Sequence, residues 1–204
     1  PLETLLDAAE HAFVSEARGG IYLTRDELPE KRKILEDSLN QTLSLTRLYR
    51  AEVAPEIQPV CVERKFVIDA GFSLPLAGIM DIEQADTIDD IKTSNAKWPE
   101  NRIREEIQPA FYSFAYEHEF GRRPGFKYHI LVPYKTGPQR QVQTWRAEAP
   151  DYDALRSRIL IFERILQTGT FAPASPGAWW CAEKWCGYWL TCPYVGNALP
   201  GRWV

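Results

Sequence analysis

Three strand-length apolar runs follow one another closely in the middle of the chain, and this arrangement limits the fold more than any other feature. The runs extend from Ile57 to Ile68, from Leu74 to Ile82 and from Thr87 to Lys92, with only short polar segments between them. Antiparallel strands can be joined by short turns, whereas parallel strands need a long crossover. The sequence therefore predicts three successive strands that pair antiparallel at first.

Helical patterns lie on both sides of these strands. Four segments carry apolar residues at the spacing of a buried helical stripe: Leu2 to about Ala17, Pro29 to about Ala51, Pro99 to about Phe120, and Asp151 to about Gln167. Gly19 and Gly169 follow two of them as C-cap signals. Pro109 marks either a kink or the first residue of a further helix.

A second pair of strand-like runs, Phe126 to Tyr134 and Gln139 to Trp145, is separated by residues typical of a hairpin turn. Together the patterns predict an α/β fold with a mixed central β-sheet flanked by helices. We expect one domain with three regions: helices at 1–55, a core at 56–170, and a Cys/Trp-rich tail at 171–204.

The composition is that of a globular domain, since 45% of the 204 residues are hydrophobic and 25% are charged. No apolar run reaches the roughly eighteen residues that span a bilayer, and the start at Pro1 lacks the pattern of a signal peptide. We therefore expect a cytoplasmic protein that does not enter a membrane. Because the chain begins without an initiator Met, we also expect a segment to be missing upstream.

The net charge of -4 argues against a protein that coats nucleic acid nonspecifically, because phosphate binding depends on Lys and Arg. It is compatible with a protein that gathers carboxylates around cations and confines its basic residues to one groove. Seven basic residues in the middle of the chain could line such a groove or form a solvated face: Arg102, Arg104, Arg122, Arg123, Lys127, Lys135 and Arg140.

Two aspartates and a lysine in the predicted strands are the strongest chemical signal. Asp90 and Lys92 are two positions apart in one strand, so their side chains project from the same face. If the strand of Asp81 pairs with this one, the second carboxylate joins them across the ladder. Two converging carboxylates suit Mg²⁺ or Mn²⁺ and the hydrolysis of a phosphodiester, with Lys92 orienting or stabilising the attacking hydroxide. We expect Asp89, on the opposite face, to be exposed or structural.

Three short motifs occur in order along this core: Gly78-x-x-Asp81, Asp90-Ile91-Lys92-Thr93, and Gln108-x-x-x-Tyr112 on the following helix. The ordered set resembles that of RecB-like nucleases, a branch of the PD-(D/E)XK superfamily that includes CRISPR-associated and phage exonucleases. The resemblance covers roughly Ile57 to Cys192, and its specificity comes from the order of the motifs rather than from any one of them.

The resemblance implies a restriction-endonuclease-like core and a Mg²⁺- or Mn²⁺-dependent DNA exonuclease in repair or recombination, with a helicase or recombination protein as partner. It also implies that Asp81 and Asp90 bind metal, that Lys92 is catalytic, and that Gln108 and Tyr112 support the site or contact DNA. Because Gln108 and Tyr112 share a helical face, a core tyrosine with its hydrogen-bonding partner is an equal alternative.

Glu63 is a further candidate for the metal or its surroundings, because RecB-like proteins often carry a Glu in this strand. It could equally form a surface ion pair with one of the two basic residues that follow it. The family usually has an upstream metal-binding His, but His11 lacks the expected preceding Gly. We expect His11 to be a helix-surface residue, with a ligand role as the alternative, and His118 and His129 to be satisfied surface or core residues.

The tail carries three cysteines, Cys181, Cys186 and Cys192, among several tryptophans. The resemblance implies that such a triplet, with one upstream cysteine, holds a [4Fe-4S] cluster. The first gap is wider than in the family, and Cys61 lies in a predicted core strand, where a free Cys is commonly a small buried hydrophobe. A zinc site and reduced thiols are the alternatives. The tryptophans could stack unpaired bases, but packing of the tail is the favoured role.

Two other functions stay open. A catalytically silent DNA-binding or scaffolding module would keep the fold without turnover, although it has no evident need for the Asp-x-Lys pairing. A site-specific endonuclease of the restriction type would share the core, and the Gln108/Tyr112 motif and the cysteine tail argue against it.

Overall fold

The computed structural model describes residues 1–175, 178–192, 194 and 202–203. The chain divides into two compact units. The first unit comprises Pro1–Thr46 and Thr170–Val204, and the second comprises Arg47–Gly169. Among the described helices, none combines the length and apolar character needed to cross a bilayer.

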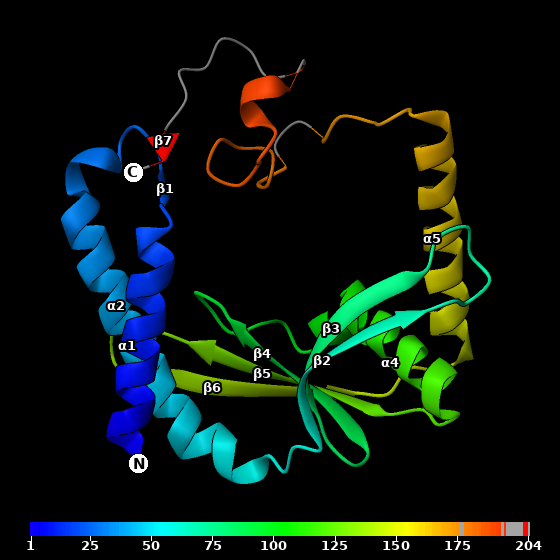
Figure 1. Cartoon of the computed structure of the whole chain (residues 1–204), viewed down its shortest axis with the longest axis horizontal. Helices are drawn as coiled ribbons and strands as arrows, with labels where there is room; N and C mark the ends of the chain where they lie inside the picture. Colours follow the sequence, from blue (N-terminus) through cyan, green and yellow to red (C-terminus); the bar gives the residue numbers. More distant parts are fainter. Residues whose placement is uncertain (176–177, 193, 195–201, 204) are drawn as a thin grey trace. The chain divides into compact units, whose positions relative to one another are not determined.

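The second unit is built on a five-stranded sheet in the order β2-β3-β4-β5-β6 (Figure 1). Its strands are β2 (Cys61–Ile68), β3 (Leu76–Glu83), β4 (Thr87–Thr93), β5 (Gly125–Val132) and β6 (Gln139–Trp145). β4 and β5 pair parallel, and the other neighbours pair antiparallel. The predicted mixed sheet, its antiparallel start and its final hairpin are thus confirmed, although β2 begins four residues later than predicted.

The parallel pair follows from the long connection between β4 and β5, which contains α3 (Arg102–Glu105) and α4 (Ile107–Phe120). The predicted helix across this region is broken at Glu106, whose backbone is extended. Pro109 is therefore neither a kink nor the first residue of the second helix, which begins two residues earlier. A proline fits there because the first turn of a helix has no backbone acceptors for its N–H groups.

α4 covers one face of the sheet, and α5 (Ala149–Thr168) packs against α4 (Figure 1). Between α4 and the strands lies an apolar core that includes Phe66, Met80, Ile88, Phe114, Tyr116, Phe126, Tyr128 and Ile130. Gly169 ends α5 in the left-handed conformation, as its C-cap signal predicted. β5 is buried along nearly its whole length and β4 is buried at three successive residues, so the apolar side chains that face α4 hold these central strands against the helix.

The first unit contains α1 (Leu2–Arg18), most of α2 (Lys31–Leu48) and a two-stranded pairing of β1 (Tyr22–Leu23) with β7 (Arg202–Trp203). α2 is shorter than the predicted helix, because a π-helical turn at Tyr49–Val53 and a 3₁₀ turn at Ala54–Glu56 replace its end. The described part of the tail forms turns, and Lys184 there forms an ion pair with Glu27 at 2.5 Å.

Candidate active site

The two central antiparallel strands separate at the place where the predicted site residues lie. β3 and β4 are paired only at Ile82 with Asp89 and at Glu83 with Ile88. Beyond those pairs the strands diverge, and the Asp81 carboxylate accepts a hydrogen bond from the backbone N–H of Ile91 at 3.3 Å. We refer to this opening between Asp81 on β3 and residues 90–92 on β4 as the fork.

Asp90 is fully buried beside the fork, on the sheet face that α4 covers. Its Oδ1 accepts a hydrogen bond from Gln108 Nε2 at 2.8 Å. Its Oδ2 lies 2.7 Å from Lys92 Nζ in an ion pair, yet it has no partner with hydrogen-bond geometry among the described residues. The Lys92 side chain is 31% exposed, so this buried carboxylate lies next to a solvent-accessible amine.

The surroundings of Asp90 make its negative charge costly. Burial raises the pKa of Asp90 to about 6, and the nearby negative charge of Asp81 adds to the effect, while Lys92 and Gln108 oppose it. A buried carboxylate oxygen with unused lone pairs, close to a second carboxylate, is suited to a hard divalent cation. The residues present therefore fit a Mg²⁺ or Mn²⁺ ion, with Asp81 and Asp90 as the groups that would hold it.

Gln108 links this carboxylate to the strand behind it. Its Nε2 donates to Asp90, and its Oε1 accepts from the hydroxyl of Tyr128 at 3.2 Å. Burial raises the pKa of Tyr128, so its hydroxyl stays protonated and available as a donor. Lys92 Nζ also lies 5.5 Å from the centre of the Tyr128 ring. Tyr128 was missed in the sequence analysis, and its only signal is its place in the alternating pattern of β5.

The structure does not bring Tyr112 to the carboxylates together with Gln108. Its ring instead packs against Phe66 and Phe126, with centroids 5.8 and 6.3 Å away. Gly78, the first residue of the motif that contains Asp81, permits this packing. A Cβ atom at position 78 would lie 2.6 Å from Phe66 Cζ and 3.3 Å from Tyr112 Cε1. The glycine is thus needed for a close approach of aromatic rings to the strand.

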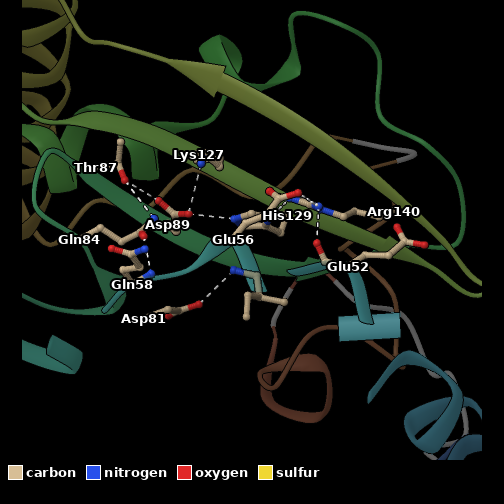
Figure 2. A network of polar contacts seen from close by, with 11 residues as sticks. Glu52, Glu56, Gln58, Asp81, Gln84, Thr87, Asp89, Lys127, His129 and Arg140 are labelled. Carbon is tan, nitrogen blue, oxygen red and sulfur yellow. Dashed lines mark hydrogen bonds and ion pairs between the residues drawn. The ribbon is translucent and has the colours of Figure 1, made fainter. Parts of the chain in front are cut away.

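Asp89 lies on the opposite face of β4 from Asp90, and it is also fully buried. The expectation of an exposed side chain is wrong, and the alternative of a structural role agrees with its contacts. Its carboxylate accepts from Thr87 Oγ1 at 2.8 Å and contacts His129 Nε2 at 2.9 Å (Figure 2). Although burial opposes ionisation, these hydrogen bonds keep the pKa of Asp89 below its ordinary value.

The model of the PD-(D/E)XK nuclease superfamily matches residues 2–193. The chain belongs to this superfamily. No curated protein matches the chain significantly. This PD-(D/E)XK chain is similar in structure to a candidate exonuclease from Eubacterium rectale, with a TM-score of 0.50 and 16% identity. The match covers 69% of this chain and 57% of that protein, so the chain spans little more than half of its length.

The structure of the protein SSO0001 also matches, over 90% of this chain and 80% of that one, with 14% identity. Its TM-score of 0.42 is too low for any conclusion. At 16% identity the likeness to the Eubacterium rectale protein concerns the fold alone. Membership of the PD-(D/E)XK superfamily thus rests on the family match, and it agrees with the mixed sheet and its flanking helices.

The other predicted site residues of this PD-(D/E)XK chain lie apart from the fork or at its margin. Glu63 is an exposed residue of β2 with a left-handed φ of 51°. Its two neighbours on β2 are paired with the two neighbours of Asp81 on β3. Its alternative, a surface ion pair with Arg64 or Lys65, is not found among the described ion pairs, and Arg64 instead binds Glu83 and Glu119. His11 is exposed on α1, as expected.

The cysteines do not form a recognisable metal centre. Cys181, Cys186 and Cys192 are half-buried free thiols. Cys61 lies in a strand of the central sheet, as predicted, but it is only partly buried there. Within the described part of the chain, no cluster of three or more His, Cys, Asp or Glu side chains is found that could hold a metal ion, so the cysteines have no such partners there. Some of the tail lies outside the described residues, and the described part supports neither an iron–sulfur cluster nor zinc.

Proposed function

We propose that this PD-(D/E)XK chain is a Mg²⁺- or Mn²⁺-dependent deoxyribonuclease of the RecB-like type that acts as an exonuclease. The buried Asp90 carboxylate carries the proposal, because it sits between Lys92 and Gln108 and faces a second acidic residue across the fork. Burying a charge that is only partly compensated lowers the stability of the folded state. Residues whose pKa is perturbed in this way are commonly found at functional sites.

In the proposed mechanism, Asp81 and Asp90 would hold the cation, and Gln108 fixes the orientation of the Asp90 carboxylate through its hydrogen bond. When bound, a divalent cation makes water more acidic and offsets negative charge that develops on the phosphoryl oxygens. Lys92 projects from the same face of β4 as Asp90, so its ammonium can stabilise the same developing charge or orient the attacking hydroxide. The 2.7 Å contact with Asp90 holds that ammonium in place until substrate arrives.

We further propose that the two compact units form one nuclease domain. The superfamily match runs from residue 2 to residue 193 and therefore includes parts of both units. The proposal also includes activity at a DNA end and a helicase or recombination protein as partner. Both are supported by the resemblance of the motif order to that of RecB-like nucleases.

The test of this function is the degradation of linear DNA with Mn²⁺ by the unaltered chain and by Lys92→Ala. The unaltered protein should degrade the DNA, and Lys92→Ala should be slower by at least about 100-fold. Lys33→Ala is the control, because Lys33 is also a lysine in an ion pair with a carboxylate, that of Glu30 at 3.8 Å, but it is exposed on α2 in the other compact unit. Equal activity of Lys92→Ala and the unaltered chain would remove Lys92 from the mechanism.

The same assay separates an exonuclease from an endonuclease. An exonuclease should release short products from end-labelled linear DNA and leave covalently closed circles intact. Cleavage of the circles would favour the restriction-type alternative.

A catalytically silent DNA-binding module is the second candidate. It is favoured by the small number of ligands, because the described residues bring two carboxylates to the fork rather than a cluster of three metal-binding groups. Binding of DNA ends without turnover under either Mg²⁺ or Mn²⁺ would support this candidate against the enzyme.

A further inference from the structure

Asp89 occupies the last position at which β4 is paired on both sides. Its neighbours are Ile82 on β3 and Lys127 on β5. From Asp90 onward, β4 is paired with β5 alone, and on the β3 side the Asp81 carboxylate binds the free N–H of Ile91. The place where the fork begins therefore depends on how firmly Asp89 is held.

Asp89 is held by side chains that the proposed chemistry does not use. Its Oδ2 is 2.9 Å from His129 Nε2 and 3.7 Å from Lys127 Nζ, and its Oδ1 accepts from Thr87 Oγ1 at 2.8 Å. His129 is fully buried and comes from β5. Two successive residues of β4, Asp89 and Asp90, thus carry buried carboxylates on opposite faces, and each has its own set of partners.

The proton on His129 can be assigned from its second neighbour. Arg140 Nη2 lies 3.0 Å from His129 Nδ1, and a guanidinium can only donate hydrogen bonds. His129 Nδ1 is therefore the acceptor, so the proton of the neutral ring is on Nε2 and is donated to Asp89. Arg140 is itself fixed by Glu56, at 2.7 and 2.5 Å, and by the backbone carbonyl of Glu52.

These contacts form a continuous chain of polar groups (Figure 2). It runs from Glu56, after the π-helical turn, through Arg140 on β6 and His129 on β5 to Asp89 on β4. Each link has a defined direction, because the carboxylates accept, the guanidinium donates, and the imidazole does both. A break at the last link leaves a buried carboxylate next to the fork with fewer partners, which favours movement of β4.

We propose that His129 is a positioning residue for the metal site, because its hydrogen bond to Asp89 fixes β4 at the base of the fork and thereby the distance between Asp81 and Asp90. This inference rests on the proposed function. His129 itself contacts neither the cation nor the DNA. Its effect passes along the backbone from Asp89 to Asp90, which project from opposite faces of the same strand.

A pair of substitutions separates this role from simple structural support. In His129→Gln, the longer amide reaches the position of Nε2 and can still donate to Asp89, but the contact with Arg140 is lost. In His129→Asn, the shorter amide reaches only the position of Nδ1, so it can accept from Arg140 but cannot reach Asp89. Both variants lose the ring and one of its two hydrogen bonds, and a purely structural role predicts similar effects for both.

The readout is the affinity of the full chain for Mn²⁺ in the absence of DNA. It is obtained from the electron paramagnetic resonance signal of the free hydrated ion, which decreases as the ion binds. Thermal unfolding of each variant measures its stability in parallel. Asp90→Asn serves as the reference for a damaged site. We expect the unaltered chain and His129→Gln to bind Mn²⁺ with similar affinity, and His129→Asn to bind about tenfold more weakly.

The outcomes distinguish this inference from the proposed function. Equal Mn²⁺ affinity in His129→Asn and His129→Gln, with normal binding by the unaltered chain, would overturn the role of His129 alone. Absence of Mn²⁺ binding by the unaltered chain would overturn the proposed function and this inference with it. If His129→Asn does not fold, Thr87→Val removes a different hydrogen bond to Asp89, at a partly exposed site. It should weaken Mn²⁺ binding by a smaller factor, and an unchanged affinity would count against the proposal.

Discussion

Replacing Asp90 with asparagine should stabilise the metal-free protein at neutral pH. The pKa of Asp90 is about 6 in the folded chain, against an ordinary value of 3.8. The folded state therefore binds this proton more tightly than the unfolded state does, and stability falls as the pH rises from about 4 to about 6. The difference between the two pKa values corresponds to about 3 kcal/mol above pH 7, where the carboxylate is charged.

Asparagine has nearly the same shape and carries no charge, so it avoids this cost while it can still accept from Gln108. The attraction between Asp90 and Lys92 is lost in the variant, but it is already included in the raised pKa from which the cost of about 3 kcal/mol follows. The Lys92 ammonium is partly exposed, so water can solvate it in the variant. The measurement is urea unfolding at pH 4 and at pH 7.5 with a chelator. Asp90→Asn should exceed the unaltered chain by up to about 3 kcal/mol at pH 7.5 and differ little at pH 4.

Asp89→Asn is the matched control, because it alters the next residue of the same strand and is equally buried. The pKa of Asp89 is lowered, so its ionised form stabilises the folded state above the unfolded pKa, and this contribution is lost as the pH falls. Asp89→Asn should therefore be less stable than the unaltered chain at pH 7.5. A loss of stability at pH 7.5 in both variants would refute the reasoning about Asp90.

Three further outcomes can be measured. Mn²⁺ should raise the unfolding temperature of the unaltered chain and leave that of Asp90→Asn almost unchanged, because only an ion that binds the folded state stabilises it; an equal rise in both would contradict the assigned ligand. Gln108→Ala should reduce DNA cleavage more than Tyr128→Phe, since Gln108 touches the Asp90 carboxylate directly, whereas the Tyr128 hydroxyl that phenylalanine lacks donates to Gln108; the reverse order in kcat would refute this. Gly78→Ala should lower the free energy of unfolding by about 1–3 kcal/mol, because its Cβ would overlap Phe66; unchanged denaturant curves would show that the ring moves aside at no cost.

Much of the fold could be read from local patterns. The strands with Asp81 and with Asp90 and Lys92 follow from alternation and from short polar separators, and a strand places every second side chain on one face whatever its partners are. For the same reason the common face of Asp90 and Lys92 could be predicted, and their ion pair agrees with it. The break at Glu106 could not be predicted, because local propensity alone does not decide where two helical turns part.

The surroundings of the site were less predictable. Tyr128 joins Gln108 and the Lys92 ammonium only because β5 pairs parallel with β4, which places Tyr128 beside Asp90 in the register. The parallel pairing depends on the path of a connection that includes two helices. Tyr112 shares a helical face with Gln108, but its ring packs edge-on against Phe66 in the aromatic core, and that contact depends on a strand far away in the sequence.

The sequence by itself determined which groups could act together: two aspartates, a lysine and a glutamine at spacings that strands and a helix bring to one side. Only the tertiary structure decided that Asp89 and Asp90 are both buried and that the pairing of β3 with β4 ends at Asp89. It also decided that His129, itself in contact with Arg140, binds the Asp89 carboxylate. The physical reason is that side-chain direction follows from local backbone geometry, whereas burial and charge compensation depend on segments far apart in the chain.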